Sequence, residues 1–377
     1  MRFFATAAKG TEPALRDELR ELRLRHVRAD RGGVHFEGDL FDAARACLWS
    51  RVAVRVLLEL GSFAAPSENA LYDGVRAITW DRWMSPRTTL AVRAACRSSH
   101  LTHSQYVAQK TKDAVVDVLR ERCGARPSVD RADPDVGIAV HLARDLATIY
   151  LDVGGASLHA RGWRGHGGAA PLRETLAAAV LRLSGWDPDL PIVDPMCGAG
   201  TIAIEAAARS CRIAPGLSRP RFGLERWASC DEAMHRGIDA LRQEARASRR
   251  KVGAPVRASD VDPRAVEWTR HNAAAAGVDI EIELRGLRDL RDLEPAGFVV
   301  TNPPYGERLD APADVYRELA RCVERMRSHT IAILAGTPEI ARGMRPPDRW
   351  WILYNGDIEC RLLVYGPAPP MGTRPPS

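Results

Sequence analysis

The chain has 377 residues, of which 45% are hydrophobic and 27% are charged, and its formal net charge at pH 7 is +6. This length exceeds what one ordinary domain needs, and this composition is that of a folded protein and excludes a largely disordered one. The eight cysteines form no CxxC pair and no Cys/His cluster with zinc-ligand spacing, and no apolar run is long enough to span a membrane. We therefore expect a cytoplasmic protein with no metal site and no membrane association.

The N-terminal part predicts a small domain, residues 1–60, with one sheet and helices on one side of it. Leu15, Leu19 and Leu22 recur on one face of an expected helix. The expected helices cover residues 12–24 and 40–48, and the expected strands cover residues 3–7, 33–37 and 53–60.

Residues 61–154 predict a second compact α+β domain. Its expected helices cover residues 71–78 and 104–122, and its expected strands cover residues 89–95, 137–142 and 147–153. The buried stripe of the longer helix consists of Val107, Val115, Val118 and Leu119. Lys110 and Lys112 lie off that stripe, so we expect both side chains to face outward.

Positive charge is concentrated in this second domain. Residues 86–131 contain nine Lys/Arg and four Asp/Glu, which accounts for five of the six net positive charges. Such a stretch favours a surface that binds a polyanion. A solvated helix face explains the charge equally well, so the charge pattern leaves both interpretations open.

Residues 155–170 are rich in glycine, which predicts a linker, and the pattern of expected helices and strands changes after them. From residue 171 to residue 366 strands alternate with helices, which predicts an α/β domain with a Rossmann-like, largely parallel sheet. Residues 367–377 contain five prolines and no apolar periodicity, so we expect them to be disordered.

A strand, a glycine loop and a helix open the Rossmann-like part. The strand ends in Asp194, and the loop contains Gly198 and Gly200. The loop lacks the third glycine of a dinucleotide site and the lysine of a phosphate loop, which disfavours NAD and ATP. A carboxylate at the strand end repels phosphate but accepts hydrogen bonds from an ammonium group, which points to S-adenosylmethionine. The alternative role of Asp194 is to cap the following turn.

Two further acids, Asp260 and Asp262, follow the next strand. In doubly wound sheets the acid after the second strand accepts hydrogen bonds from ribose hydroxyls. We assign that role to Asp260 and expect Asp262 to cap a helix that begins at Pro263. An arginine-rich insertion at about residues 209–251 separates these acids from Asp194, and we interpret it as a cover for the sheet or as part of a substrate entrance.

The sequence Asn-Pro-Pro-Tyr at residues 302–305 follows a later strand. The prolines stiffen the turn and present the Pro303 carbonyl as an acceptor. If Asn302 Oδ1 and that carbonyl accept both hydrogens of an aromatic amine, the nitrogen lone pair can point at a methyl donor without a strong general base. We expect Tyr305 to stack on the base. An ordinary proline turn is the alternative, although the preceding glycine loop and acids favour catalysis.

Together these motifs resemble those of class I methyltransferases that carry an N-terminal THUMP module. The resemblance covers nearly the whole chain to about residue 309, and it is strongest to the enzymes that form N2-methylguanosine in bacterial 23S rRNA, of the guanine-2445 type. It is carried by GGVHFEGD (32–39), LWSRVAVRVLL (48–58), SQYVAQKTKDAVVD (104–117), RPSVDRADPDV (126–136), RGWR (161–164), PLRETLAAAVL (171–181), DPMCGAGT (194–201) and NPPYGERL (302–309). It implies a ferredoxin-like domain, a THUMP RNA-binding module and a class I methyltransferase domain, in that order.

The resemblance also implies the residues of each site. The implied catalytic residues are Asn302, Pro303, Pro304 and Tyr305. The implied residues for S-adenosylmethionine are Asp194, Pro195, Cys197, Gly198, Gly200, Thr201, Asp260 and Asp289. In the family, an acid that binds the adenine amine often follows the third strand. Glycine occupies that place in this sequence, and Asp289, three residues later, is included instead. The implied RNA-binding residues are Lys110, Lys112, Arg126, Arg131, Arg161 and Arg164.

RNA is therefore the expected partner, with 23S rRNA first and tRNA second, and no oligomeric state is predicted. Some family members carry a second methyltransferase domain that forms 7-methylguanine, and the proline-rich end predicts that this activity is absent here. Three alternatives stay open. They are N2-guanine methylation of tRNA, N6-adenine methylation of DNA, and an RNA-binding ribosome assembly factor with a vestigial cofactor site.

Overall fold

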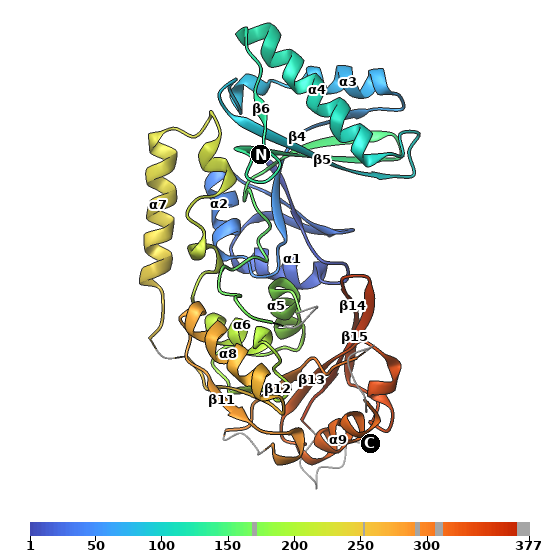
Figure 1. The fold of residues 1–377 in the computed structure, drawn as a ribbon, viewed down its shortest axis with the longest axis vertical. Helices are drawn as coiled ribbons and strands as arrows, with labels where there is room; N and C mark the ends of the chain where they lie inside the picture. The colour runs from blue at the N-terminus through green and yellow to red at the C-terminus, as the bar shows by residue number, and fades with distance from the viewer. Residues whose placement is uncertain (168–171, 252, 291–294, 306–311, 368–377) are drawn as a thin grey trace. The chain divides into compact units, whose positions relative to one another are not determined.

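The computed structural model describes residues 1–167, 172–251, 253–290, 295–305 and 312–367 (Figure 1). The chain divides into two compact units. Unit 1 comprises Met1–Ala7, Leu15–Ala160 and Gly216–Ala245. Unit 2 comprises Ala8–Ala14, Arg161–Pro215 and the described residues from Arg246 onward. Each unit is built around one sheet.

The sheet of unit 1 has eight strands in the order β2-β3-β1-β4-β8-β7-β5-β6. In chain order they are β1 (Arg2–Thr6), β2 (Arg25–Asp30), β3 (Gly33–Glu37), β4 (Arg55–Ala64), β5 (Thr89–Arg97), β6 (Ser128–Val129), β7 (Val136–Ala143) and β8 (Leu146–Asp152). Strand β4 runs across the predicted domain boundary at residues 60 and 61, and it pairs antiparallel with both β1 and β8. The two predicted N-terminal domains therefore share one continuous sheet.

The helices of this part are α1 (Glu12–Glu21), α2 (Leu40–Trp49), α3 (Glu68–Arg76), α4 (Ser104–Cys123) and α7 (Glu232–Ala247). Helices α3 and α4 lie side by side, and α4 packs on β5 (Figure 1). The stripe predicted for the longer helix is confirmed, because Val107, Val115, Val118 and Leu119 are all buried in α4. That helix ends at Gly124, whose φ of 73° lies in the left-handed region.

The arginine-rich insertion contributes residues 216–245 to unit 1. Trp227 packs edge-on against Trp83, with ring centroids 5.6 Å apart. Arg226 Nη2 donates to Asp133 Oδ2 at 2.8 Å. A Cβ at Gly223 would lie 2.7 Å from the Asp152 carbonyl oxygen, so the backbones approach closely at that point. The insertion thus packs on the β7–β8 part of the N-terminal sheet.

The sheet of unit 2 has seven strands in the order β11-β10-β9-β12-β13-β15-β14. They are β9 (Ile192–Asp194), β10 (Val256–Asp260), β11 (Glu281–Leu284), β12 (Phe298–Thr301), β13 (Thr330–Ala335), β14 (Arg349–Asn355) and β15 (Ile358–Tyr365). Strands β9 to β13 pair in parallel, and β15 pairs antiparallel with β13 and β14. The predicted Rossmann-like α/β fold is confirmed. Because β9 lies between β10 and β12, the strand order reverses at β9 and opens a crevice at the carboxyl ends.

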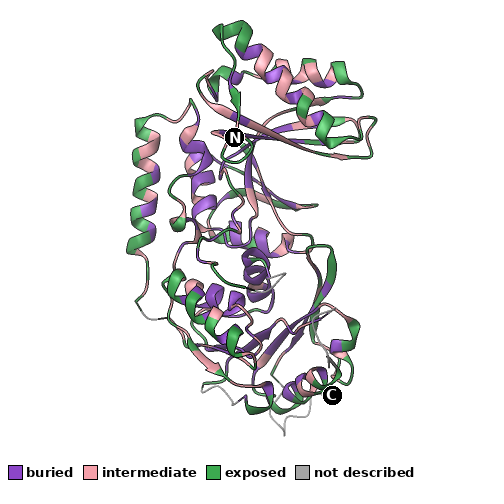
Figure 2. Ribbon diagram, in the orientation of Figure 1, coloured by how far each residue is buried: buried purple, intermediate pink, exposed green. Residues whose placement is uncertain are grey.

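In the described part of unit 2, the helices beside this sheet are α5 (Glu174–Leu183), α6 (Thr201–Ser210), α8 (Pro263–Ala276) and α9 (Pro312–Arg325). Nearly every residue of α5 is buried (Figure 2). Part of the segment predicted as a linker packs here, since Trp163 is buried against Ile204 and Ala273. Asn272 Oδ1 also accepts from the backbone N–H of Gly165 at 3.1 Å.

The tail predicted to be disordered, residues 367–377, lies outside the described residues except for its first proline. Within the described ranges, every helix is too short or too polar to cross a membrane.

Candidate cofactor cavity and nucleic-acid groove

A cavity of about 760 Å³ opens at the strand-order reversal of unit 2. Its walls are formed by residues that follow the carboxyl ends of β9, β10 and β12, together with residues of α8 and α9. The predicted site residues that line it are Asp194, Pro195, Cys197, Gly198, Thr201, Asp260, Asp289, Asn302, Pro303 and Pro304. The fold thus brings three separate motifs together around one cavity of a size that fits a small-molecule ligand.

The glycine loop between β9 and α6 forms one wall of this cavity. Gly198 has a φ of 54°, and no described atom lies within 4 Å of where its Cβ would be, so the backbone faces open space. Gly200 has a φ of 82° and precedes α6, and its Cβ would lie 2.8 Å from Thr269 Cγ2. Thr269 Oγ1 donates to the Gly198 carbonyl at 2.9 Å, and Asn272 Nδ2 donates to the Ala199 carbonyl at 3.0 Å. Helix α8 therefore fixes the loop from behind.

Asp194 ends β9 at the base of the cavity and is 3% exposed. Burial raises the pKa of its carboxyl to about 7, and the nearby negative charge of Asp260 adds to this shift. The backbone N–H of Met196 approaches Asp194 Oδ1 at 3.4 Å. A buried carboxyl with so little compensation is well suited to receive a cationic group from a ligand.

Asp260 ends β10 on the other side of the loop. Its Oδ2 accepts from the Gly198 N–H at 2.9 Å, and its Oδ1 accepts from the Asp262 N–H at 3.0 Å. The predicted cap is confirmed, because Asp262 Oδ1 accepts from the Arg264 N–H at 2.9 Å and α8 begins at Pro263. Asp260 is therefore held rigidly beside the glycine loop.

The charge around the cavity is strongly negative. Among the described lining residues, the acids are Asp194, Asp260, Asp262, Asp289, Asp314 and Glu318. The single basic lining residue in the same set is Arg288, whose Nε lies 3.2 Å from Glu318 Oε1. Such a wall favours a cationic ligand and opposes one that carries phosphates.

The Asn-Pro-Pro turn follows β12 and reaches the cavity through Asn302, Pro303 and Pro304. Asn302 Oδ1 is buried and has no hydrogen-bond partner among the described residues. An acceptor left in this state costs free energy unless a ligand supplies a donor. The Pro304 carbonyl accepts from the Tyr316 hydroxyl of α9 at 3.0 Å, which holds the turn in place.

Two predicted residues lie outside the described cavity wall. Gly200 shapes the loop from behind, as its contact with Thr269 indicates. The position of Tyr305 does not fit the predicted stacking on a base, because its side chain is 5% exposed and points away from the wall. Its hydroxyl accepts from Asn355 Nδ2 at 2.9 Å instead.

Sequence reasoning missed several apolar residues of the wall, including Val261, Trp268 and Leu287. Val261 directly follows Asp260 and is 74% exposed, which is unusual for a large apolar side chain at a strand end. The sequence could have indicated this role, because Val261 directly follows Asp260, the acid assigned to the ribose hydroxyls. Trp268 and Leu287 reach the wall only through the packing of α8 and the turn at Leu287–Asp289.

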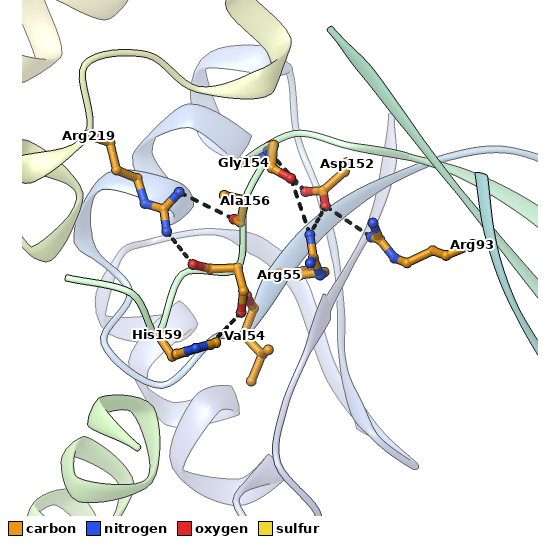
Figure 3. Close-up of polar contacts among 10 residues, drawn as sticks. Val54, Arg55, Arg93, Asp152, Gly154, Ala156, His159 and Arg219 are labelled. Atoms are coloured by element: carbon orange, nitrogen blue, oxygen red, sulfur yellow. Dashed lines mark hydrogen bonds and ion pairs between the residues drawn. The ribbon is translucent and has the colours of Figure 1, made fainter. Parts of the chain in front are cut away.

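A second cavity, of about 1240 Å³, forms a groove in unit 1. Its basic lining residues are Arg55, Arg93, Lys112 and Arg131. Figure 3 shows Arg55 and Arg93 converging on Asp152, which is fully buried. Arg93 Nη2 donates to Asp152 Oδ2 at 3.0 Å. One carboxylate thus orients two guanidinium groups beside the groove.

The insertion holds one edge of this groove. Arg219 donates to the carbonyl oxygens of Ala156 and Ser157, two residues that line the groove (Figure 3). Ser157 Oγ also lies 3.3 Å from the Val54 carbonyl and 2.7 Å from His159 Nδ1. The backbone at this edge is therefore fixed by side chains from both the insertion and the segment after β8.

The predicted RNA-binding residues separate into three groups. Lys112 and Arg131 line the groove. Lys110 and Arg126 lie outside its described wall, where the Lys110 Nζ sits 5.1 Å from the centre of the Tyr72 ring. The third group, Arg161 and Arg164, belongs to unit 2.

The positions of Arg161 and Arg164 do not fit the predicted contact with RNA. Arg161 is 6% exposed, and its Nε donates to the buried Glu205 at 3.2 Å. Arg164 donates to Glu174 at 2.8 Å and to Thr201 Oγ1 at 3.0 Å. Each guanidinium is paired with a carboxylate of unit 2, so the motif serves the packing of that unit. Arg55 and Arg93, which sequence reasoning missed, take their place as basic residues of a groove.

Comparison with known families covers most of the chain. Residues 2–57 match the family described as the RlmL ferredoxin-like domain, and residues 65–152 match the THUMP domain. Residues 161–362 match the family described as RMKL-like, methyltransferase domain.

Individual relatives agree with these matches. The chain is 44% identical, over 97% of its length, to the ribosomal RNA large subunit methyltransferase K/L of Syntrophotalea carbinolica. The chain spans about half the length of the curated relatives it matches, 53% and 51% of two of them.

Two solved structures resemble the whole chain. One is described as a methyltransferase in complex with SAH, with 31% identity, a TM-score of 0.88 and 98% of both chains covered. Another, from Listeria monocytogenes, is described as a predicted N6-adenine-specific DNA methylase, with 32% identity and a TM-score of 0.86. The match covers 97% of this chain and 96% of that one.

Proposed function

Since the chain belongs to the RMKL-like methyltransferase family, we propose that it transfers a methyl group from S-adenosylmethionine to the exocyclic N2 of a guanine in 23S rRNA, of the guanine-2445 type. The observation that carries this proposal is the buried, unpartnered Asn302 Oδ1 beside the acidic cavity. It is an acceptor that needs a donor, and an aromatic amine supplies two.

The cavity fits this cofactor in charge and in shape. Asp194 accepts from the ammonium of the amino-acid end, and Asp260 accepts from the ribose hydroxyls. Val261 and Leu287 offer apolar surface to the adenine, with Asp289 beside it for the adenine amine. When bound, S-adenosylmethionine supplies an electrophilic methyl group.

The Asn-Pro-Pro turn prepares the amine for that methyl group. Asn302 Oδ1 and the Pro303 carbonyl accept the two N–H groups, which draws the nitrogen toward tetrahedral geometry and frees its lone pair. The excess proton leaves with solvent after transfer, so no strongly basic side chain is required. The rigid turn acts mainly through orientation, a contribution that can reach about 7–11 kcal/mol for well-aligned groups.

The groove of unit 1 supports an RNA substrate. Its basic residues Arg55, Arg93, Lys112 and Arg131 line the groove together with the first turn of α4, which contains no acidic residue. Tyr106 in that turn is 40% exposed and offers an aromatic face to an unpaired base. Phosphates and unstacked bases are the parts of RNA that such a surface binds. The guanine itself must leave its stack to reach the cavity.

Removing charge from the groove is expected to weaken RNA binding in a salt-dependent way. For Lys112→Ala and Arg131→Ala, the slope of log Kd against log salt should fall by about 0.7–0.9 for each lost phosphate contact. Filter binding with transcribed large-subunit RNA between low and moderate salt measures this slope. Lys110→Ala is the matched control, because Lys110 packs over Tyr72 outside the described groove wall. Equal losses in Lys110→Ala and Lys112→Ala would contradict a role for the groove.

The substrate is tested against the alternatives by nucleoside analysis. In a strain that lacks the gene, N2-methylguanosine should be reduced in 23S rRNA and unchanged in tRNA. Loss from tRNA alone would favour the tRNA alternative, and an unchanged set of nucleosides with impaired ribosome assembly would favour an assembly factor. The similar Listeria structure is described as a predicted DNA methylase, so DNA is a substrate to test as well. Methyl transfer by the purified protein should be measured with RNA and with adenine-containing DNA in parallel.

A further inference from the structure

Tyr305 is packed into the interior of unit 2, away from the cavity that its three preceding residues line. Its hydroxyl accepts from Asn355 Nδ2 at 2.9 Å, at the end of β14. Cys360 Sγ of β15, which is fully buried, lies 3.7 Å from the same hydroxyl. The Tyr305 side chain is therefore tied to the β14–β15 hairpin.

The ring is held as closely as the hydroxyl. A Cβ placed on Gly336, directly after β13, would lie 2.4–2.5 Å from three carbons of the Tyr305 ring. Contacts this short do not occur in folded proteins, so the residue at 336 can have no side chain while the ring stays there. The glycine thus creates the space that the ring occupies.

The same turn is fastened from a second direction. The Tyr316 hydroxyl of α9 donates to the Pro304 carbonyl at 3.0 Å, one residue before Tyr305. The β14–β15 hairpin and α9 consequently hold consecutive residues of the turn. The rings of Pro303 and Pro304 further restrict the backbone of the turn. Asn302 Oδ1 is left in a fixed, buried position without a partner in the described structure.

We infer that Tyr305 is a positioning residue, which anchors the turn so that Asn302 Oδ1 and the Pro303 carbonyl face the substrate amine, and that it does not stack on the base. This inference rests on the proposed function, because it concerns the geometry of the same amine acceptors. The anchor consists of Tyr305, Asn355 and Gly336. Stacking on a base would require the ring to leave all of its present contacts.

Substitutions at the hydroxyl separate anchoring from stacking. Tyr305→Phe keeps the ring but loses the hydrogen bond, and Asn355→Ala loses the same bond from the other side. Anchoring predicts that each lowers kcat about 3- to 10-fold, the range for one neutral hydrogen bond, with the KM for RNA unchanged. The double variant should be close to Tyr305→Phe, because both substitutions remove the bond to Asn355 and Tyr305→Phe also removes the contact with Cys360 Sγ. Gly336→Ala should lower kcat roughly tenfold or more by forcing the ring out.

Tyr354→Phe is the matched control, since it removes a hydroxyl on the same strand that bonds to Glu359 outside the anchor. We expect it to retain the activity of the unaltered protein. Binding of SAH, measured by calorimetry, checks that each variant keeps the cofactor cavity. Full activity of Tyr305→Phe and Asn355→Ala, or a change confined to the KM for RNA, would overturn the inference.

A readout that does not depend on activity separates this inference from the proposed function. Hydrogen exchange of a peptide spanning residues 298–305 should be faster in Tyr305→Phe and Asn355→Ala than in the unaltered protein and in Tyr354→Phe. Unchanged exchange in both variants would overturn the anchor even if the protein methylates RNA. Faster exchange would support the anchor even if the protein methylated no RNA, a result that would reject the proposed function alone.

Discussion

Asn302→Ala is expected to lower kcat by about 10²–10³-fold, the usual effect of removing one preorganised polar group that acts on the reacting atoms. The amide oxygen is the acceptor that lies buried beside the cavity without a partner in the described residues. Its loss leaves the Pro303 carbonyl as the remaining acceptor, so the amine is no longer oriented from two sides. Single-turnover transfer of labelled methyl to RNA measures the effect directly.

Two further variants make this result interpretable. Asn302→Asp keeps an acceptor oxygen at the same place and should retain more activity than Asn302→Ala. Asn69→Ala removes the same amide from an exposed position on α3 and should behave as the unaltered protein. Binding of SAH should be unchanged in all three, because Asp194 and Asp260 are untouched. An Asn302→Ala protein with nearly full activity would contradict the acceptor role.

Asp194→Asn is expected to weaken binding of S-adenosylmethionine by roughly 2–4 kcal/mol, or about 30- to 700-fold in Kd. The carboxyl is 3% exposed, and its ionised form is the partner proposed for the cofactor ammonium. An uncharged amide of the same shape keeps the cavity but loses the ion pair. Calorimetry with SAH, which carries the same ammonium group, gives the Kd of both proteins.

The raised pKa of Asp194 adds a pH dependence to this prediction. Because burial raises this pKa from 3.8 to about 7, the carboxyl of the cofactor-free protein must lose a proton before it can pair with the ammonium below pH 7. The Kd should therefore rise about fivefold between pH 7 and pH 6 and change little above pH 7.5. Asp194→Asn should bind weakly and equally at every pH. A pH-independent Kd in the unaltered protein would contradict the buried carboxylate as the ammonium partner.

Stability without cofactor should respond in the opposite sense. Between about pH 4 and pH 7 the folded protein holds a proton on Asp194 that the unfolded chain has released, so the free energy of unfolding falls as pH rises through this window. Asp194→Asn removes this loss and should be the more stable protein at pH 8, by an amount on the order of a few kcal/mol. Thermal unfolding of both proteins at pH 5 and pH 8 provides the comparison.

Much of the fold follows from local sequence patterns. The buried stripe of α4, the parallel strands of unit 2 and the cap at Asp262 were all predictable, because each depends on residues close in sequence. Strand β2 was missed because its residues are mostly charged and exposed, so it shows no apolar alternation. The joining of two N-terminal domains through β4 and β8 was also missed. Nothing local in β4 reveals which distant strand it will pair with.

The residues of the candidate sites also separate into those that local sequence predicts and those that depend on distant partners. Residues that follow strand ends, such as Asp194, Asp260 and Asn302, were predictable because parallel strands deliver them to one edge. The predicted contact of Arg161 and Arg164 with RNA does not fit their ion pairs, which join them to Glu205 and Glu174, 44 and 10 residues farther along the chain. Arg55 and Arg93 were missed for the converse reason. Their orientation depends on Asp152, 97 and 59 residues away.

The position of Tyr305 also depends on residues far along the chain. The motif alone suggests an aromatic ring beside a base, and its actual position is set by Gly336 and by Asn355, 50 residues farther along the chain. A motif identifies the residue types that chemistry needs, whereas tertiary packing decides which of them reach the substrate.

The central claim, a paired acceptor that orients an exocyclic amine, is tested most directly by identifying the methylated nucleoside. Purified protein, labelled S-adenosylmethionine and protein-free large-subunit RNA should yield label in N2-methylguanosine, at a rate that Asn302→Ala lowers about 10²–10³-fold. Recovery of the label at guanine N7, or on adenine, would contradict the account.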